Sequence, residues 1–268
     1  MELPPILLLG GGRMGGAMLA GWRERGLAPS FIVDLAPAAA ALAGGAVQVV
    51  LVSDDLPPGF NPSAIVLAVK PQQADAALPG LARFATGGAV VLSIMAGRTV
   101  AGLRALLGGD VPVVRAMPNT PAAIRQGITV AYPGPGITPA QRSLCDGLLA
   151  SVGEVAWVDD EGLIDAVTAV SGGGPAYVFL LAELLERAAA EQGIPAALAR
   201  QLARVTVAGS GALLAASAED ASALRIAVTS PAGTTERALA VLMADAAWPT
   251  LVSRAIDAAT RRSRELAG

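Results

Sequence analysis

The sequence predicts an α/β fold: a doubly wound, parallel sheet in the first part of the chain and helices alone in the second. Two observations support this division. Up to about residue 160, short runs rich in Val, Ile and Leu alternate with helix-like segments and are separated by Gly and Pro, which is typical of buried parallel strands in a βαβ array. After Asp160, apolar residues recur at spacings of three and four, as in amphipathic helices. The predicted domains are therefore residues 1–160 and 161–268.

The predicted strands are the apolar runs of the first part, and they cover residues 6–9, 31–33, 64–69, 89–94, 111–114, 128–132 and 155–158. In the second part, Val178, Leu181 and Leu185 share one helix face, and three or four further helices follow, bounded by Pro195 and Pro231. These helices are apolar over too much of their surface for an isolated bundle. We therefore expect a homodimer, and a larger ring of dimers is left open.

Composition excludes several classes of protein. Hydrophobic residues make up 53% of the chain and charged residues 15%, so it can bury a core. A formal net charge of −3 and only 3% aromatic residues argue against nucleic acid as a partner. The longest apolar candidate for a membrane span, residues 163–182, is interrupted by Asp165 and by glycines, and no basic segment precedes the first apolar run. We expect a cytoplasmic protein without a membrane partner.

The chain contains no histidine and one cysteine, Cys145. This excludes Ser-His-Asp triads, Cys-His pairs and His-ligated zinc, and we expect no metal site. Cys145 fits a reducing compartment and is expected to be a small side chain without chemistry. Lys70 is the only lysine. Catalysis must therefore use other groups or a cofactor.

Residues 10–15, which read GGGRMG, match the glycine fingerprint of dinucleotide-binding loops. The motif directly follows the first predicted strand and opens a helix predicted over residues 14–25, and this context makes it specific. Gly10 allows a tight turn, Gly12 allows a pyrophosphate to approach the backbone, and Gly15 allows close packing of helix on strand. The first domain is therefore predicted to be Rossmann-like.

Asp34 ends the second predicted strand, about 20 residues beyond the glycine motif. An acidic side chain at this place binds the adenosine ribose 2′-hydroxyl and repels a 2′-phosphate, so NADH is favoured over NADPH. Two observations count against this choice: Arg13 can approach the adenosine side, and Asp34 can instead cap the following turn.

Four more motifs follow in the chain. They read AVKPQ at residues 68–72, RAMPNTP at 115–121, SGGGPAY at 171–177 and TSPAGTT at 229–235. In this order and spacing, and together with the glycine motif, the chain resembles the pyrroline-5-carboxylate reductase family from residue 10 to about residue 266. The resemblance implies a Rossmann-like domain, an all-helical C-terminal dimerisation domain, and reduction of 1-pyrroline-5-carboxylate to L-proline by NADH or NADPH, the last step of proline biosynthesis.

The motifs and the resemblance together predict the site residues. The expected cofactor contacts lie in the glycine motif and after predicted strands: Gly10, Gly12, Arg13, Met14, Gly15, Asp34, Ala68, Val69, Lys70, Pro71, Ala96 and Gly97. The expected substrate contacts are Ser171, Ser230, Gly233, Thr234 and Thr235, with Thr235 as the candidate catalytic residue.

A cyclic imine as substrate explains how the chain can work without histidine. Such an imine is basic enough to arrive protonated, so the protein need only position the nicotinamide and balance charge. The start of the helix predicted over residues 236–243 is an anion site suited to the substrate carboxylate, and Thr235 can hydrogen-bond the ring nitrogen. A simple helix cap is the alternative for these residues.

Four residues depart from the pattern usual in the family. Arg13 replaces Asn or Gln, Gly173 replaces Ser, Ala232 replaces Gly, and Asp34 ends a strand that often ends in Ser or Asn. Gly173 removes a hydroxyl contact. Ala232 costs about 1 kcal/mol if its position requires a positive φ. Arg13 and Asp34 both bear on the choice between NADH and NADPH.

Two other functions fit a two-domain plan. A hydroxyacid dehydrogenase of the 6-phosphogluconate type would carry a catalytic lysine on the helix after a glycine pair, but here Pro175 follows Gly174, and Lys70 lies in the other domain. A non-catalytic dinucleotide-sensing module would bind NADH without imine turnover. The arginines near the end of the chain complement a helix dipole and do not require a membrane.

Overall fold

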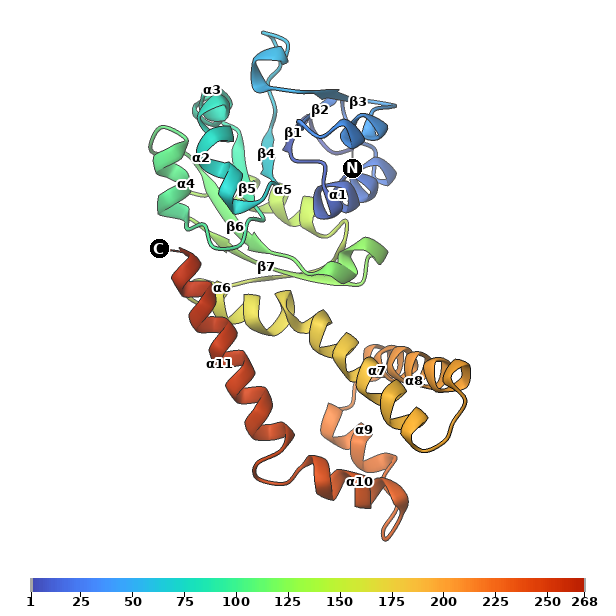
Figure 1. Cartoon of the computed structure of the whole chain (residues 1–268). Coiled ribbons are helices and arrows are strands. Elements are labelled where there is room, and N and C mark those ends of the chain that lie inside the picture. Colours follow the sequence, from blue (N-terminus) through green and yellow to red (C-terminus); the bar gives the residue numbers. More distant parts are fainter. Residues whose placement is uncertain (1, 268) are drawn as a thin grey trace. The chain divides into compact units, whose positions relative to one another are not determined.

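The computed structural model describes residues 2–267 (Figure 1). The chain forms two compact units. Unit 1 consists of Met1–Gly172 together with Ala259–Gly268, and unit 2 consists of Gly173–Ala258. The predicted boundary at residue 160 coincides with the end of the sheet rather than with the division between the units, because α6 (Leu163–Val167) packs against two strands of unit 1.

Unit 1 is built on one eight-stranded sheet with the strand order β3-β2-β1-β4-β5-β6-β7-β8. The strands are β1 (Ile6–Leu9), β2 (Ser30–Val33), β3 (Val47–Val50), β4 (Ala64–Leu67), β5 (Val90–Ser93), β6 (Val113–Met117), β7 (Gly127–Pro133) and β8 (Gly153–Trp157). All neighbouring strands are parallel except β6 and β7. The predicted doubly wound α/β fold is confirmed.

Two details of the predicted sheet are wrong. The edge strand β3 was not predicted: it is half-exposed, and its apolar segment, residues 46–52, is interrupted by Gln48. Strand β7, expected to be parallel like the others, runs antiparallel to β6. The connection between them, residues 118–126, is shorter than the dozen or more residues that a parallel crossover requires.

Helices cover both faces of the sheet (Figure 1). On one face lie α1 (Arg13–Glu24) and α5 (Pro139–Leu149), and on the other lie α2 (Ala74–Ala77), α3 (Ala82–Thr86) and α4 (Val100–Leu106). Trp22 and Leu148 are fully buried on the first face, and Leu78 and Leu103 on the second. Burial on both faces explains why the strands read as continuous apolar runs. Cys145 on α5 is also buried, which raises the pKa of its thiol to about 12 and fits the expected lack of chemistry.

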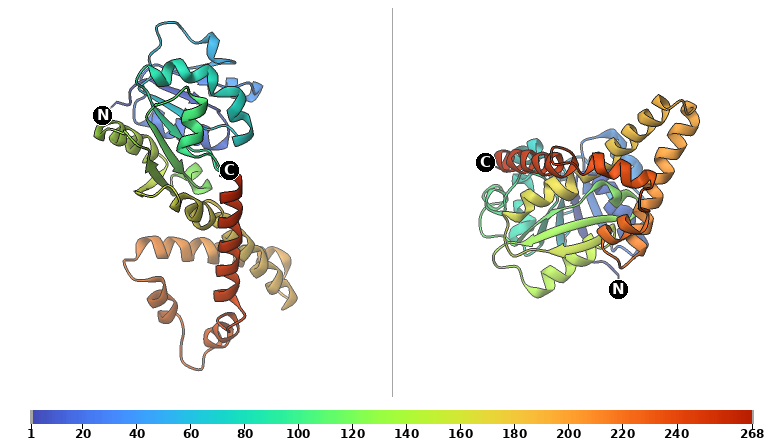
Figure 2. Two further views of the ribbon diagram at one scale, coloured as in Figure 1. Left: turned by 90° about the vertical axis from the view of Figure 1, so that its left-hand side faces the viewer. Right: turned by 90° about the horizontal axis from the view of Figure 1, so that it is seen from below.

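Unit 2 is helical throughout. It contains α7 (Gly174–Glu191), α8 (Ala196–Ala216), α9 (Ala221–Ala227), α10 (Thr234–Leu242) and the first part of α11 (Trp248–Ala267). Helices α7 and α8 pack against each other (Figure 1 and Figure 2). Among residues 173–258, all of which the structure describes, only Ala199 and Ala203 are buried. The all-helical second part is confirmed, but as a single chain it encloses almost no core.

The glycine-rich segment at residues 171–175 does not break the helix, contrary to the sequence interpretation. A π-helical turn, Thr168–Gly172, joins α6 to α7. The resulting stretch Leu163–Glu191 has 29 residues and a mean hydropathy of 1.3 in its most apolar window. By length and composition alone it is apolar enough to cross a membrane, and an oligomerising helix with an exposed apolar face has the same properties.

Candidate active site

The glycine loop between β1 and α1 has the geometry of a dinucleotide-binding turn. Gly10 has a φ of +96°, and a Cβ at this position would lie 2.9 Å from the backbone of Ala68. A Cβ at Gly15 would overlap with the Gly10 carbonyl oxygen, so only glycine lets α1 approach the loop this closely. Gly12 caps α1, and the space beside its Cα is open. A phosphate group can therefore approach the backbone at Gly12.

Asp34 connects the glycine loop to the turn after β2. Its Oδ2 accepts a hydrogen bond from the Gly11 N–H at 2.6 Å, and its Oδ1 accepts one from the Ala36 N–H at 2.8 Å. The carboxylate therefore does cap the following turn, which the sequence left as the alternative role. Arg13 is exposed at the first position of α1.

Two further loops follow neighbouring strands at the same edge of the sheet. The first, with Ala68 to Pro71, follows β4, and the second, with Ala96 and Gly97, follows β5. Because β1, β4 and β5 are adjacent and parallel, the glycine loop and these two loops lie at their carboxyl ends. This is the edge where open α/β sheets bind ligands. Unit 1 thus brings the predicted cofactor residues together.

Arg98 joins the loop after β4 to the loop after β5, and the sequence interpretation missed it. Its Nη2 donates to the Pro71 carbonyl oxygen at 2.7 Å, and its guanidinium forms a two-pronged ion pair with Asp75, with both distances at 3.0 Å. The hydrogen bond from Arg98 holds the pKa of Asp75 below its usual range. Arg98 directly follows Gly97 in the chain, but nothing in the local sequence shows which loop it would reach.

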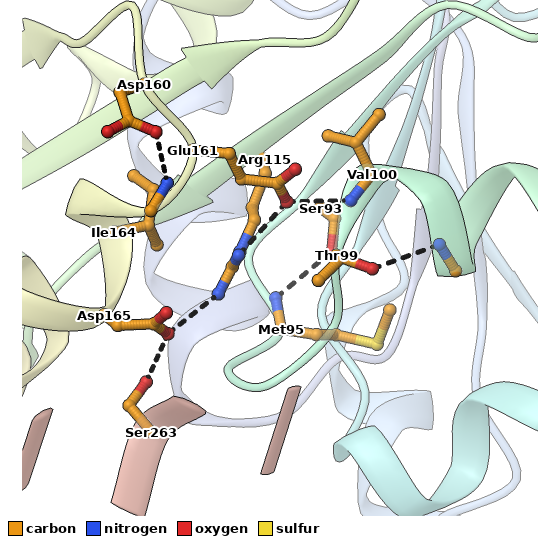
Figure 3. A network of polar contacts seen from close by, with 12 residues as sticks. Ser93, Met95, Thr99, Val100, Arg115, Asp160, Glu161, Ile164, Asp165 and Ser263 are labelled. Atoms are coloured by element: carbon orange, nitrogen blue, oxygen red, sulfur yellow. Dashed lines mark hydrogen bonds and ion pairs between the residues drawn. The ribbon is translucent and has the colours of Figure 1, made fainter. Parts of the chain in front are cut away.

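A buried polar network surrounds Arg115 on β6 (Figure 3). The Arg115 side chain, 3% exposed, lies 3.1 Å from Glu161 Oε1 and 3.5 Å from Asp165 Oδ1. The Ser263 hydroxyl on α11 donates to the same Asp165 oxygen at 2.7 Å. The motif at residues 115–121 pointed to this arginine but not to its partners.

Ser171 lies half-buried in the π-helical turn of unit 1. Its hydroxyl donates to the Val167 carbonyl oxygen at 3.1 Å, so the side chain is held against its own helix and its oxygen can still accept a hydrogen bond. Turns of this kind are common at functional sites.

The loop at residues 230–235 lies in unit 2, at the start of α10. Gly233 caps the helix, and Thr234 and Thr235 occupy its exposed first turn. Ala232 has a φ of +56°, so the position that the family usually fills with glycine does require a positive φ in this chain. The Ala232 N–H donates to Glu236 Oε2 at 2.7 Å, which leaves the N–H groups of Thr234 and Thr235 at the open end of the helix. Four of the expected substrate residues thus lie in one loop.

The fold and the three loops at one sheet edge, together with a match to a family model, define the class of protein. Residues 5–97 match the model described as NADP oxidoreductase, coenzyme F420-dependent. The class is an oxidoreductase that uses a nicotinamide dinucleotide.

The helical part and the whole-chain relatives define the family. Residues 161–266 match the model of the pyrroline-5-carboxylate reductase dimerisation domain, in agreement with the predicted homo-oligomer. The pyrroline-5-carboxylate reductase of Pseudomonas aeruginosa is 38% identical over 100% of this chain and 98% of its own, and that of Mycobacterium tuberculosis is 37% identical over 97% and 96%. A solved pyrroline-5-carboxylate reductase from Coxiella burnetii covers both chains completely, with a TM-score of 0.91 and 30% identity. The chain belongs to the pyrroline-5-carboxylate reductase family.

Proposed function

We propose that the protein reduces 1-pyrroline-5-carboxylate to L-proline with NADH or NADPH as hydride donor, in the last step of proline biosynthesis. The observation that carries the proposal is the loop at residues 230–235, which opens α10 with free N–H groups and two threonine hydroxyls. In a chain without histidine, this combination suits an anionic substrate that needs no protein acid. The family membership of the whole chain supports the same reaction.

The cofactor is assigned to the loops at the sheet edge of unit 1. The open space at Gly12 and the start of α1 suit the pyrophosphate, because first-turn N–H groups lack helical partners and favour anions. Asp34 would hold the adenosine ribose, with Gly10, Arg13, Met14 and Gly15 forming the rest of the turn. Ala68, Val69, Lys70, Pro71, Ala96 and Gly97 would line the nicotinamide end. A nicotinamide dinucleotide bound there would supply the hydride.

The substrate is assigned to the first turn of α10. The N–H groups of Thr234 and Thr235 would bind the carboxylate, supported by Gly233 and Ser230 in the same loop. The Thr235 hydroxyl would accept a hydrogen bond from the protonated ring nitrogen. Ser171 is proposed as a further substrate contact. Hydride addition to the imine carbon forms the new C–H bond, and the C=N electron pair moves to nitrogen, which becomes the secondary amine of L-proline.

We further propose that NADH is preferred to NADPH. The Asp34 carboxylate is fixed by the Gly11 and Ala36 N–H groups at the place where a 2′-phosphate would have to lie, and like charges in contact repel each other. Arg13 is the residue that opposes this preference, since its exposed guanidinium can attract the same phosphate.

The helical domain is proposed to form a homodimer, with a ring of dimers as a possible larger assembly. The exposed apolar side chains of unit 2 support this proposal, because they need a partner surface to exclude water. We also propose that the enzyme works in the cytoplasm without a membrane partner, since a second copy can cover the apolar face of Leu163–Glu191.

The proposed reaction is tested by following the loss of NADH and of NADPH with 1-pyrroline-5-carboxylate, with proline measured as the product. We expect proline to form in equal amount to the oxidised cofactor. Stable NADH binding without turnover would instead indicate a dinucleotide sensor, and oxidation of a hydroxy acid would indicate a dehydrogenase. The dehydrogenase would require a catalytic lysine on α7, and α7 has none.

A further inference from the structure

The loop that carries Ala96 and Gly97 is anchored at both ends. At its start, the Met95 N–H donates to the buried Ser93 hydroxyl oxygen at 3.3 Å. At its end, the Val100 N–H, which opens α4, donates to Glu161 Oε1 at 2.8 Å. The same glutamate oxygen is paired with Arg115 at 3.1 Å. The position of the loop therefore depends on the Arg115 network (Figure 3).

The last turns of α11 lie directly against this loop. Gly97 is buried with a φ of +66°, and a Cβ at this position would be 3.0 Å from the Leu266 Cβ and 3.1 Å from the Leu266 carbonyl oxygen. The loop backbone and the helix are thus in contact without space for a side chain between them. Any shift of α11 along this contact would move Gly97.

Ser263 fixes the end of α11 in place one turn before Leu266. Ser263 is 6% exposed and Asp165 is 7% exposed, and their hydrogen bond is 2.7 Å long. Asp165 in turn faces Arg115, so one buried arginine is linked to the end of the loop through Glu161 and to the last helix through Asp165. Breaking a buried polar network of this kind has a large effect, because the partners left behind cannot reach water.

We propose that Ser263 and Leu266 are positioning residues for hydride transfer: the end of α11, held by Asp165 and Arg115, fixes the Ala96–Gly97 loop where it meets the nicotinamide end of the cofactor. The inference rests on the proposed assignment of this loop. It assigns to the end of the last helix a role in cofactor geometry that the motifs at residues 10–15 and 229–235 do not contain.

If the end of α11 has this role, substitutions there should affect the nicotinamide end of the cofactor and not the adenosine end. The adenosine end is assigned to Gly12 and Asp34. Within the described residues 2–267, the Asp34 carboxylate bonds to the Gly11 and Ala36 N–H groups and not to the Arg115 network. Substitution of Ser263 or Leu266 should therefore weaken hydride transfer but leave the binding of ADP-ribose, which lacks the nicotinamide, unchanged. A residue that only stabilises the fold would affect both.

The experiment compares Ser263→Ala and Leu266→Gly, which removes the Cβ that lies against Gly97, with Arg262→Ala in the full-length protein. Arg262 lies beside Ser263 on the same helix, but its ion pair with Glu265 is exposed, so its variant should behave as wild type. For the first two variants we expect kcat with NADH to fall about tenfold. The ratio of kcat with unlabelled NADH to kcat with 4-deuterated NADH should increase, because hydride transfer becomes the slower step. The inhibition constant of ADP-ribose should stay within about twofold of wild type.

Two variants of Glu161 test the other end of the loop. Glu161→Gln keeps an oxygen that accepts the Val100 N–H, whereas Glu161→Ala removes it. We expect the glutamine variant to retain more of the hydride-transfer rate than the alanine variant, again at constant ADP-ribose binding. Equal loss of ADP-ribose binding and of activity in all variants would overturn the inference and indicate a general loss of structure.

Gly97→Ala strains the loop itself. It therefore tests whether the loop contacts the nicotinamide, independently of whether α11 positions the loop. If Gly97→Ala impairs hydride transfer while Ser263→Ala and Leu266→Gly leave it unchanged, the loop has its assigned role and the helix does not position it. If Gly97→Ala also leaves turnover unchanged, the assignment of the loop to the nicotinamide is wrong.

Discussion

The two units of the chain stabilise themselves in different ways. Unit 1 buries apolar side chains on both faces of its sheet, including Trp22 and Leu92. Unit 2 has a comparable supply of apolar residues, but its single chain buries only Ala199 and Ala203. The lesson is that hydrophobic patterning alone does not indicate a self-sufficient core. In unit 2 the apolar faces of the helices stay exposed in the single chain, and the loop proposed to bind substrate lies in this unit.

The two units should differ most in their response to a charge placed on an exposed apolar residue. Phe179 on α7 is 67% exposed, and Ile124 in unit 1 is 70% exposed. Phe179→Glu should abolish assembly and lower activity by more than about a hundredfold, because a buried unpaired charge costs several kcal/mol. Ile124→Glu should change neither.

Sedimentation at micromolar concentration gives the readout. The wild type should sediment as at least twice the 26.7 kDa of one chain, and so should Ile124→Glu. A fully active wild-type monomer, or equal behaviour of the two variants, would show that unit 2 does not depend on a partner chain to cover its apolar side chains.

The next largest effect is expected in the loop at residues 230–235, which is proposed to bind the substrate. Thr235→Val keeps the shape of the side chain and removes its hydroxyl. Loss of one hydrogen bond to a charged group costs about 1.5 to 3 kcal/mol, or roughly 10- to 150-fold in kcat/KM for 1-pyrroline-5-carboxylate. NADH affinity should hardly change, since the cofactor is assigned to unit 1.

Steady-state kinetics measure kcat/KM of Thr235→Val, with Thr86→Val as the control. Thr86 is exposed on α3, where its hydroxyl donates to its own helix, and the variant should behave as wild type. A change within about twofold for Thr235→Val would remove the hydroxyl from the site and shift the assignment to Ser171 or to backbone groups.

A smaller effect is expected at Asp34 in unit 1. Wild-type kcat/KM should be at least as high with NADH as with NADPH, and Asp34→Ser should shift the ratio about tenfold toward NADPH, which corresponds to about 1.4 kcal/mol of removed repulsion. Asp34→Asn is the matched variant, because it keeps an oxygen acceptor for the Gly11 or Ala36 N–H. If the serine variant shifts the ratio and the asparagine variant does not, the lost hydrogen bonds and not the charge determine the preference.

Much of unit 1 could be predicted from the sequence because its signals are local. The continuous apolar runs gave β1, β4 and β5, and the glycine motif gave the turn before α1. The condition stated for Ala232 also proved correct, since its φ is +56°. Local patterns failed where exposure weakened them, as in β3, and where the length of a connection decided strand direction, as in β7.

The polar links between distant segments could not be predicted in this way. Arg98 reaches back to Pro71, and Ser263 reaches Asp165, 98 residues earlier in the chain. Hydrogen bonds between such segments leave no periodic pattern in the sequence, because only the completed fold brings the partners together. The sequence indicated Arg115 as part of a motif, but its pairing with two carboxylates depends on α6 packing against the sheet.

The smallest effect is expected from relieving the strain at Ala232. Ala232→Gly should raise the free energy of unfolding by up to about 1 kcal/mol, because glycine adopts a positive φ without steric cost while also losing more chain entropy on folding. Ala238→Gly on α10 is the matched control, and the same substitution inside a regular helix should lower stability by about 0.5 to 1 kcal/mol. Thermal unfolding of the two variants at one protein concentration tests this, and a change of the same sign in both would show that Ala232 stores no strain.

Transfer of a labelled hydride from cofactor to substrate is the direct test of the proposed reaction. The protein is supplied with 1-pyrroline-5-carboxylate and NADH deuterated at the transferring position, and the proline formed is examined by mass spectrometry and NMR. We expect one deuterium per proline molecule at the former imine carbon, which is the ring carbon next to nitrogen that does not bear the carboxylate. Proline without deuterium, or no proline while NADH remains bound and unoxidised, would contradict the proposed reaction.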